Sequence, residues 1–224
     1  MGRPTKLSKA LPRMERFFKK NKETEIYTYD QLRVVLKERR EQWDLPKAFH
    51  TDSFIRALQE GKVGLKKTTF PFYPVHITRY VLGTIGYSDA LKIAASLNKK
   101  AYLSHYTALY LHGLTEQLPK NIYASYEQKA TPNNGPVTLL QANIDRAFRG
   151  APRVSKNEAD YGDYKIILLN GKNTEETGVI VKNGVRITSL ERTLIDSVVR
   201  AFYVGGVFEV LKAFEAAKQA LSVN

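Results

Sequence analysis

The stretch "HTDSFIRALQEGKVGLKKTTFPFYPVHITRYVL", residues 50–82, carries the pattern that decides the fold of the first part of the chain. Its first half has helical spacing, with Thr51 or Asp52 as the cap, Gly61 at the end and three apolar side chains turned inward: Phe54, Ile55 and Leu58. The segments "VGLKKTTF" and "VHITRYVL" then have the composition of strands, and "PFYP" lies between them. We therefore expect a helix followed by a hairpin.

Two more helices and a short strand are expected before this stretch. Apolar residues recur at the spacing of one helical face in the first segment, at Leu11, Met14, Phe17 and Phe18. "EIYTY" is a strand-like run, and Thr28 with Gln31 forms a capping box that opens the second helix. The order helix, short strand, helix, turn, helix and hairpin is that of a winged helix-turn-helix, which we expect over residues 1–80.

In such a fold the third helix enters the major groove of DNA, with its N-terminal side chains nearest the base edges. The groove-facing residues expected here are Lys47, His50, Thr51, Ser53 and Arg56. Lys66 and Lys67 of the hairpin would lie along the phosphate backbone, where charge gives affinity without sequence information. The arm "GRP", which holds Arg3, resembles the core of basic arms that bind the minor groove.

The charge of the chain supports a polyanionic partner. The net charge is +13, and residues 1–80 hold 18 Lys and Arg against 9 Asp and Glu, whereas residues 81–224 hold 17 against 13. The excess of positive charge is therefore concentrated in the predicted winged helix, and the expected partner is double-stranded DNA. No apolar run is long enough to span a membrane and cysteine is absent, so we expect a cytoplasmic protein.

From about residue 81 the pattern becomes a mixture of helices and strands. "NIYASYE", "PVTLLQAN" and "DYKIILLN" have strand composition, "TPNNGP" is a turn, and "GVIVKNGVRITS" is a hairpin around Asn183 and Gly184. The fold class predicted for the whole chain is α+β, with the winged helix-turn-helix followed by a mixed domain over residues 81–224.

Besides "DALKIAASL" (89–97), which Ser88 is expected to cap, three helices are expected in this second domain. The first, in "AYLSHYTALYLHGLT" (101–115), is capped by Ser104 and ends at Gly113, and the second, "SLERTLIDSVVRAF", is opened by a capping box of Thr188 and Glu191. The last begins after Gly205 and Gly206 and is expected to bury five apolar side chains: Val207, Val210, Leu211, Phe214 and Ala217.

The sequence gives little sign of catalysis. His105 and His112 share one face of a predicted helix but lie roughly 10 Å apart along its axis, too far to share a metal ion, so both are expected to be hydrogen-bonded core residues. An alternative is a metal-dependent nuclease in which Asp163 and Lys165 act with Asp145 or Asp160. Its acid-x-lysine pattern is weakly specific because the chain holds two further examples. We therefore expect no catalytic residue, metal or cofactor.

Several longer stretches resemble one family. "YLSHYTALYLHGLTEQLPKNIY", "IDRAFRGAPR", "ILLNGKNTEETGV" and "ITSLERTLIDSVVRAFYVGGVFEVLKA" occur in the order found in the antitoxins of abortive-infection type E systems, which are classed as type IV toxin-antitoxin systems. The resemblance spans roughly residues 80 to 220. One departure lies outside it, because the connection "EQWDLPKAFHTDS" (41–53) is long for a compact helix-turn-helix.

The resemblance implies two activities. The winged helix would repress the protein's own operon at promoter inverted repeats, and the second domain would counteract a nucleotidyltransferase-like toxin without a stable complex. A plain transcription regulator whose second domain senses a small molecule is a further alternative.

Overall fold

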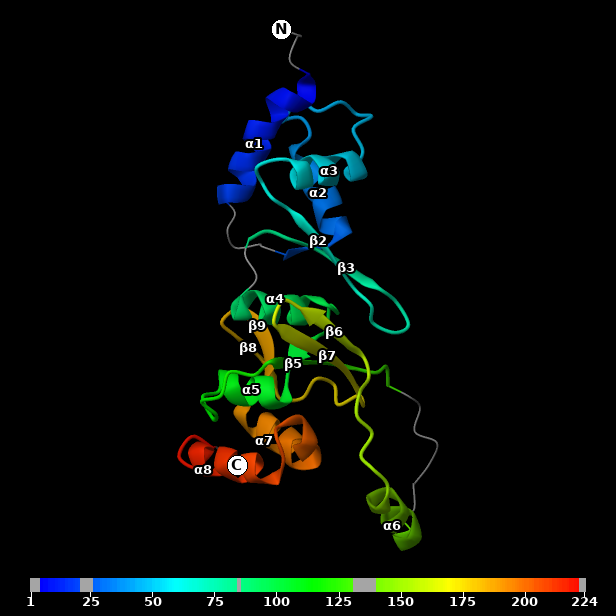
Figure 1. The fold of residues 1–224 in the computed structure, drawn as a ribbon, viewed down its shortest axis with the longest axis vertical. Helices are drawn as coiled ribbons and strands as arrows, with labels where there is room; N and C mark the ends of the chain where they lie inside the picture. Colours follow the sequence, from blue (N-terminus) through cyan, green and yellow to red (C-terminus); the bar gives the residue numbers. More distant parts are fainter. Residues whose placement is uncertain (1–4, 21–25, 84–85, 131–139, 222–224) are drawn as a thin grey trace. The chain divides into compact units, whose positions relative to one another are not determined.

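The computed structural model describes residues 5–20, 26–83, 86–130 and 140–221, so Arg3 and the predicted turn "TPNNGP" lie outside the described residues (Figure 1). The chain divides into two compact units, Met1–Ile93 and Ala94–Asn224, which we call unit 1 and unit 2. The division falls inside helix α4 (Tyr87–Ser96), whereas the sequence pattern predicts a boundary between residues 80 and 81.

Unit 1 combines three helices with a small antiparallel sheet. Its elements are α1 (Lys6–Lys20), β1 (Ile26–Tyr27), α2 (Tyr29–Arg39), α3 (Thr51–Glu60), β2 (Lys66–Phe70) and β3 (Ile77–Val81). The strand order is β1-β3-β2, with Phe70 opposite Ile77 next to the hairpin turn. The helices and the sheet share one apolar core, which includes Met14, Leu36, Phe54 and Leu58.

The long connection between α2 and α3 is packed into this core. Trp43 and Leu45 are buried, and the Trp43 ring stacks on Phe54 with 5.6 Å between centroids. The Arg40 side chain donates hydrogen bonds to the carbonyl oxygens of Pro46 and Lys47. Because aromatic packing and backbone hydrogen bonds hold both halves of the connection, it is an ordered approach to α3.

Unit 2 is built on a mixed sheet with the strand order β6-β7-β5-β4-β9-β8. The strands are β4 (Tyr102–Leu103), β5 (Asn121–Glu127), β6 (Glu158–Tyr161), β7 (Tyr164–Gly171), β8 (Val179–Lys182) and β9 (Val185–Thr188). The pairs β5–β7 and β4–β9 are parallel, and the other neighbours are antiparallel. The sequence-predicted strands at β5 and β7 and the hairpin at Asn183 and Gly184 are confirmed.

Helices cover this sheet in layers (Figure 1). They are α5 (His105–Leu111), α7 (Leu190–Val199) and α8 (Val207–Ala217), with a 3-10 turn η1 (Ala201–Tyr203) before α8. Helix α5 packs against β5 and α7, and α8 packs against α7. The described part of the chain is therefore an α+β protein, as predicted, with α6 (Gln141–Arg149) as a further helix.

Several local expectations were wrong. Residues 141–143, predicted as the end of a strand, are helical in α6. The last helix buries Val210, Ala213 and Ala217, whereas Val207 and Leu211 are 64% and 60% exposed. Its inward face is therefore rotated from the predicted one.

The predicted caps had mixed outcomes. The capping box of Thr28 and Gln31 is confirmed. Helix α3 is instead capped by His50, which makes no side-chain cap hydrogen bond, and α7 is capped by Ser189, whose hydroxyl accepts from the backbone N–H of Arg192. Among the helices of the described residues, none has both the length and the apolar character to cross a membrane.

Candidate functional site

The first candidate surface is the exposed face of α3. Because α3 turns Phe54, Ile55, Ala57 and Leu58 into the core, the opposite face carries Ser53 and Arg56 to the surface. His50 and Lys47 are exposed just before the helix, and Thr51 is half-buried. The structure thus brings five of the sequence-predicted DNA contacts, from Lys47 to Arg56, to the N-terminal end and outer side of one helix.

The second candidate surface is the hairpin. Lys66 and Lys67 are exposed, but they pair with Val81 and Tyr80 at the end of the hairpin away from its turn. The turn itself, "PFYPVH" (71–76), has no lysine or arginine, and it exposes Tyr73 and Val75 while burying Phe72. Any phosphate contact by these two lysines would therefore be made at the base of the hairpin.

A third surface, the outer face of α1, is not among the sequence-predicted DNA contacts. Lys6, Lys9, Arg13, Arg16 and Lys20 are all exposed, and we call them the α1 stripe. Their spacing of three or four residues places them on one side of the helix, over about 21 Å at 1.5 Å per residue. The signal was present in the sequence, because the buried positions Ala10, Met14 and Phe18 fix which side of the helix faces outward.

The connection between α2 and α3 joins the α1 stripe to α3. Lys6 makes an exposed ion pair with Asp44 at 3.4 Å, and the guanidinium of Arg13 donates to the carbonyl oxygen of Gln42 at 3.1 Å. Lys47 and His50 follow in the same connection and lead into α3. The α1 stripe and the start of α3 thus border one segment of chain, residues 42–50.

In unit 2, three of the stretches that carry the family resemblance meet at one side chain, Arg192 of α7. One amino group of its guanidinium donates to the Tyr102 hydroxyl at 3.0 Å and to Glu127 at 3.2 Å. The other donates to the Thr174 hydroxyl at 2.9 Å and to the Thr177 carbonyl, and Nε lies 3.5 Å from Asp196. All five N–H groups of Arg192 therefore have a partner.

Glu127, at the end of β5, fixes the loop that follows β7. Its carboxylate accepts hydrogen bonds from the backbone N–H groups of Thr174 and Glu176 at 2.6 and 3.1 Å, and from the Thr174 hydroxyl. Burial raises the pKa of this carboxyl, but the hydrogen bonds from Thr174, Glu176 and Arg192 outweigh it and lower the pKa to about 2. Glu127 is therefore an ionised, structural partner of Arg192.

His105 is a hydrogen-bonded core residue, as predicted, whereas His112, the residue after α5, is hydrogen-bonded but only half-buried. His105 is 5% exposed, and its Nδ1 lies 2.9 Å from the Ser104 hydroxyl, which in turn lies 2.7 Å from the Ser125 hydroxyl. His112 hydrogen-bonds through Nε2 to the carbonyl oxygen of Thr188 at 2.8 Å. Burial, followed by the positive charges of Arg200 and Arg192, lowers the pKa of His105 to about 3, so this ring is neutral at physiological pH.

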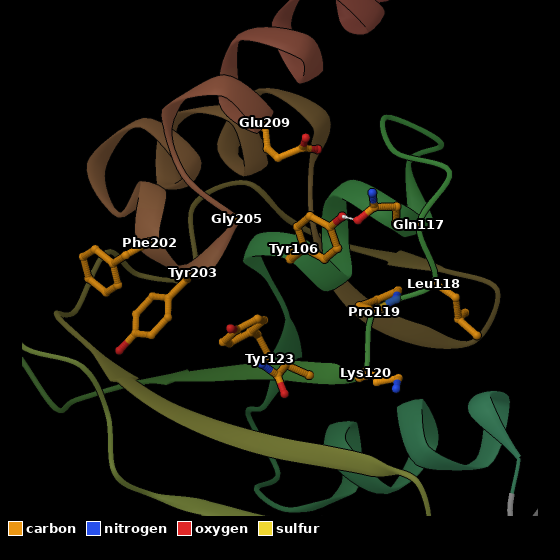
Figure 2. A pocket seen from close by; sticks show the side chains of 11 residues that line it. Tyr106, Gln117, Leu118, Pro119, Lys120, Tyr123, Phe202, Tyr203, Gly205 and Glu209 are labelled. Atoms are coloured by element: carbon orange, nitrogen blue, oxygen red, sulfur yellow. Dashed lines mark hydrogen bonds between the residues drawn. The ribbon is translucent and has the colours of Figure 1, made fainter.

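A hollow of about 490 Å³ opens between α5, β5, η1 and α8. Figure 2 shows its aromatic walls, with Tyr106 pointing toward Gln117 and Tyr123 facing Tyr203. The Tyr123 and Tyr203 rings are 5.3 Å apart, and the Tyr106 hydroxyl donates to Gln117 at 3.2 Å. Its one lining carboxylate, Glu209, pairs with Lys212 at 2.9 Å, and the other charged side chain in its lining is Lys120.

Among the residues of the nuclease alternative, Asp160, Asp163 and Lys165 lie in the β6–β7 hairpin, whereas Asp145 lies in α6. Lys165 pairs with Glu158 at 2.8 Å, and Asp160 lies opposite Lys165 in the β6–β7 ladder. Asp163 is exposed in the tight turn between these strands, and Asp145 of α6 accepts a hydrogen bond from Gln141 at 2.7 Å. Within the described ranges, no group of three His, Asp or Glu side chains could hold a metal ion.

Comparison with known proteins gave no relative, because no protein-family model matches the chain and no curated protein matches it. Chemically, unit 1 offers exposed cations on α1, at the start of α3 and at the base of the hairpin, which suit a polyanion. Unit 2 has hollows large enough for a small molecule. Beside them lie the neutral His105 and Arg192, whose N–H groups all have partners within the protein.

Proposed function

We propose that this protein is an antitoxin of the abortive-infection type E class that binds DNA through unit 1 and represses its own operon. The observation that carries the proposal is the arrangement of unit 1, with the element order α1-β1-α2-α3-β2-β3, the strand order β1-β3-β2 and cations on its exposed helix faces. From this order we infer a winged helix-turn-helix with α3 as the recognition helix.

Charge gives the second support. Residues 1–80 carry a net charge of +9 from 18 basic and 9 acidic residues. Within α3, however, Arg56 stands between Asp52 and Glu60, so the cations that favour DNA lie mainly on the α1 stripe. We infer that the α1 stripe and the hairpin base contact phosphates, whereas Arg56, Ser53 and His50 contact bases.

A DNA-binding measurement tests the repressor half. We expect a duplex from the region upstream of the gene to bind more tightly than a shuffled duplex of the same composition, with affinity falling steeply as salt rises. The variant Arg56→Ala is expected to reduce this preference, because it removes a base contact. Equal binding to the two duplexes by the wild-type protein would overturn the repressor assignment.

Charge variants test whether DNA binding depends on the α1 stripe or on positive charge anywhere on the protein surface. A triple variant, Lys9→Gln with Arg16→Gln and Lys20→Gln, is expected to weaken binding to both duplexes alike. The slope of log affinity against log salt should become shallower by about 0.9 for each phosphate that the variant no longer neutralises. The matched control replaces three exposed lysines of unit 2, Lys99, Lys156 and Lys218, with glutamine and should leave the slope nearly unchanged.

The antitoxin half rests on the resemblance and on unit 2. We propose that unit 2 counteracts a nucleotidyltransferase-like toxin in the cytoplasm without forming a stable complex. Co-expression with the neighbouring gene tests this proposal, and the full chain is expected to restore growth. The α1 triple variant should restore growth as well, because its changes lie in the other unit. Failure of the wild-type chain to rescue would refute the antitoxin half and leave the DNA measurement unaffected.

A further inference from the structure

A cavity of about 360 Å³ lies at the carboxyl ends of β5 and β7, under α7. It is distinct from the aromatic hollow of Figure 2, and its lining residues include Tyr102, His105, Ser125, Lys172, Asp196 and Arg200. Crevices at the carboxyl ends of parallel strands are common binding sites for small ligands, because loops converge there and side chains leave the sheet. The size and place of this cavity suit such a ligand.

Two cations of the cavity make no side-chain hydrogen bond within the described residues. Arg192 already has a partner for each of its N–H groups, and Asp196, the one carboxylate among the lining residues, pairs with Arg192. Arg200 is half-buried, yet its guanidinium makes no hydrogen bond or ion pair with any described residue, and the same holds for the exposed Lys172. The charge of Arg200 acts on Asp196 and His105 without a hydrogen bond to either, so its N–H groups are available to an anion in the cavity.

A buried polar side chain faces the same space. His105 lines the cavity, and its Nδ1 is tied to Ser104, which is tied to Ser125. Within the described residues its Nε2 has no hydrogen-bond partner. His105 also has a φ of 50°, in the left-handed region that non-glycine residues rarely adopt and that is enriched at functional sites.

A second hollow of about 470 Å³ adjoins the cavity and shares Leu169, Val199 and Arg200 with it. It adds Phe202, which is 38% exposed, and Arg153. Arg200 therefore stands where the cavity meets a second hollow that has the aromatic ring of Phe202 in its lining. This arrangement fits a ligand with an anionic group on one side of Arg200 and an organic group on the other.

We propose that this double cavity of unit 2 binds a nucleoside phosphate, with Arg200 and Lys172 holding the phosphate, His105 hydrogen-bonding to it, and the nucleoside lying toward Phe202. Phosphate is the anion that matches a planar guanidinium and an ammonium together, and an exposed aromatic ring is a stacking surface for a base. The lining residues of both hollows all belong to unit 2.

The test is a titration of the full-length protein with AMP, inorganic phosphate and adenosine, followed by the ¹⁵N signals of the imidazole rings. The His105 signal is assigned with His105→Asn, and it reports on unit 2 even if phosphate also binds the basic surface of unit 1. We expect AMP to shift the His105 signal at lower concentration than phosphate does, and adenosine to have little effect.

Variants decide which side chains hold the phosphate. Arg200→Gln is expected to weaken AMP binding by roughly tenfold to a hundredfold, as for loss of a charged hydrogen bond, and Lys172→Gln by a smaller factor. Lys218→Gln, which changes an exposed lysine just after α8, is the matched control and should bind AMP as the wild type does. Thermal unfolding of each variant checks that it is folded.

Two results would overturn the proposal. The first is an unshifted His105 signal at millimolar AMP, and the second is equal AMP affinity for folded Arg200→Gln and the wild type. Equal affinities of the wild type for phosphate and AMP would overturn the placement of the nucleoside at Phe202. None of these outcomes bears on DNA binding or toxin rescue.

Discussion

At the scale of single residues, Arg192 ties together parts of unit 2 that are distant in the sequence. The Glu127 side chain beside it is only 3% exposed. Replacing Arg192 with alanine would leave this buried carboxylate without its cation, so we expect Arg192→Ala to lower the free energy of unfolding by about 3 kcal/mol. Denaturant unfolding followed by circular dichroism measures the loss.

The comparison with Arg192→Lys distinguishes charge from geometry. Lysine restores the positive charge, but it has no planar fork to reach Tyr102, Glu127 and Thr174 together, so we expect it to recover only part of the stability. Full recovery by lysine would contradict the role of the fork. If Arg192→Ala lowered the free energy of unfolding by less than about 1 kcal/mol, the Arg192–Glu127 ion pair would contribute no more than an exposed ion pair does.

His105 should make the stability of unit 2 sensitive to acid. Its pKa is about 3 in the folded protein against an ordinary value of 6.5, because burial and then the charges of Arg200 and Arg192 disfavour the imidazolium. As pH falls from 6.5 toward 3, the unfolded chain takes up a proton that the folded chain does not. The free energy of unfolding should therefore fall by up to about 1.4 kcal/mol per pH unit from this group.

Unfolding curves at several pH values between 4 and 7 check this prediction. His105→Asn removes the titrating ring with a residue that tolerates a positive φ, and it should flatten the fall. Tyr203→Phe is the matched control, because the Tyr203 ring packs 5.2 Å from the His105 ring and the variant keeps the histidine. If the free energy of unfolding of His105→Asn fell with pH as steeply as that of the wild type, the acid sensitivity would come from other groups.

At the scale of elements, the start of α3 lacks a side-chain cap. His50 has the extended backbone of an N-cap, with φ −85° and ψ 164°, but its side chain makes no cap hydrogen bond. Serine at this position would accept a hydrogen bond from the first turn, so His50→Ser should raise the free energy of unfolding of unit 1 by about 1 kcal/mol. Thr28→Ala, which breaks the observed capping box of α2, should lower it by a similar amount.

The His50 variant also bears on DNA recognition. If His50 contacts a base, His50→Ser should lose preference for the upstream duplex while gaining stability, so misfolding would not explain the loss. Retained preference together with higher stability would remove His50 from the base-contacting set. Chemical denaturation and the duplex comparison are the two measurements.

The elements that sequence reasoning located correctly are those fixed by neighbouring residues. The capping box at Thr28 and Gln31 and the turn at Asn183 and Gly184 depend on contacts within a few positions. Ser104 is the N-cap of α5, as predicted, but its hydroxyl bonds to Ser125 and makes no cap hydrogen bond. Thr188 precedes the observed cap of α7, Ser189, and its hydroxyl bonds to Thr193. The position of a serine or threonine in the sequence does not show which hydrogen-bond partner its hydroxyl takes in the folded protein.

Long-range packing explains the other differences. Glu127 and Arg192 are 65 positions apart, so no local pattern could pair them. In α8 several faces are apolar, and the side that packs against α7 is decided by the tertiary fit, which leaves Phe208 81% exposed. The α1 stripe, by contrast, follows from the spacing of the charged residues once the buried face of α1 is known.

At the scale of the whole molecule, each unit has a hydrophobic core of its own. The core of unit 1 includes Leu36, and one core cluster of unit 2 includes Leu194. Calorimetry of the full chain should therefore show two transitions. The upstream duplex should raise the transition of unit 1, because a ligand stabilises the part of the chain that binds it.

Truncation of one core side chain in each unit shows which unit unfolds in which calorimetric transition. Leu36→Ala should destabilise unit 1 by about 2–5 kcal/mol and lower only the transition that DNA raises, whereas Leu194→Ala should lower only the other. Both side chains are almost fully buried, at 1% and 2% exposed, so each variant is the control for the other. If either variant lowered both transitions equally, the units would unfold as one cooperative body, and DNA binding in unit 1 would be energetically linked to whatever occupies unit 2.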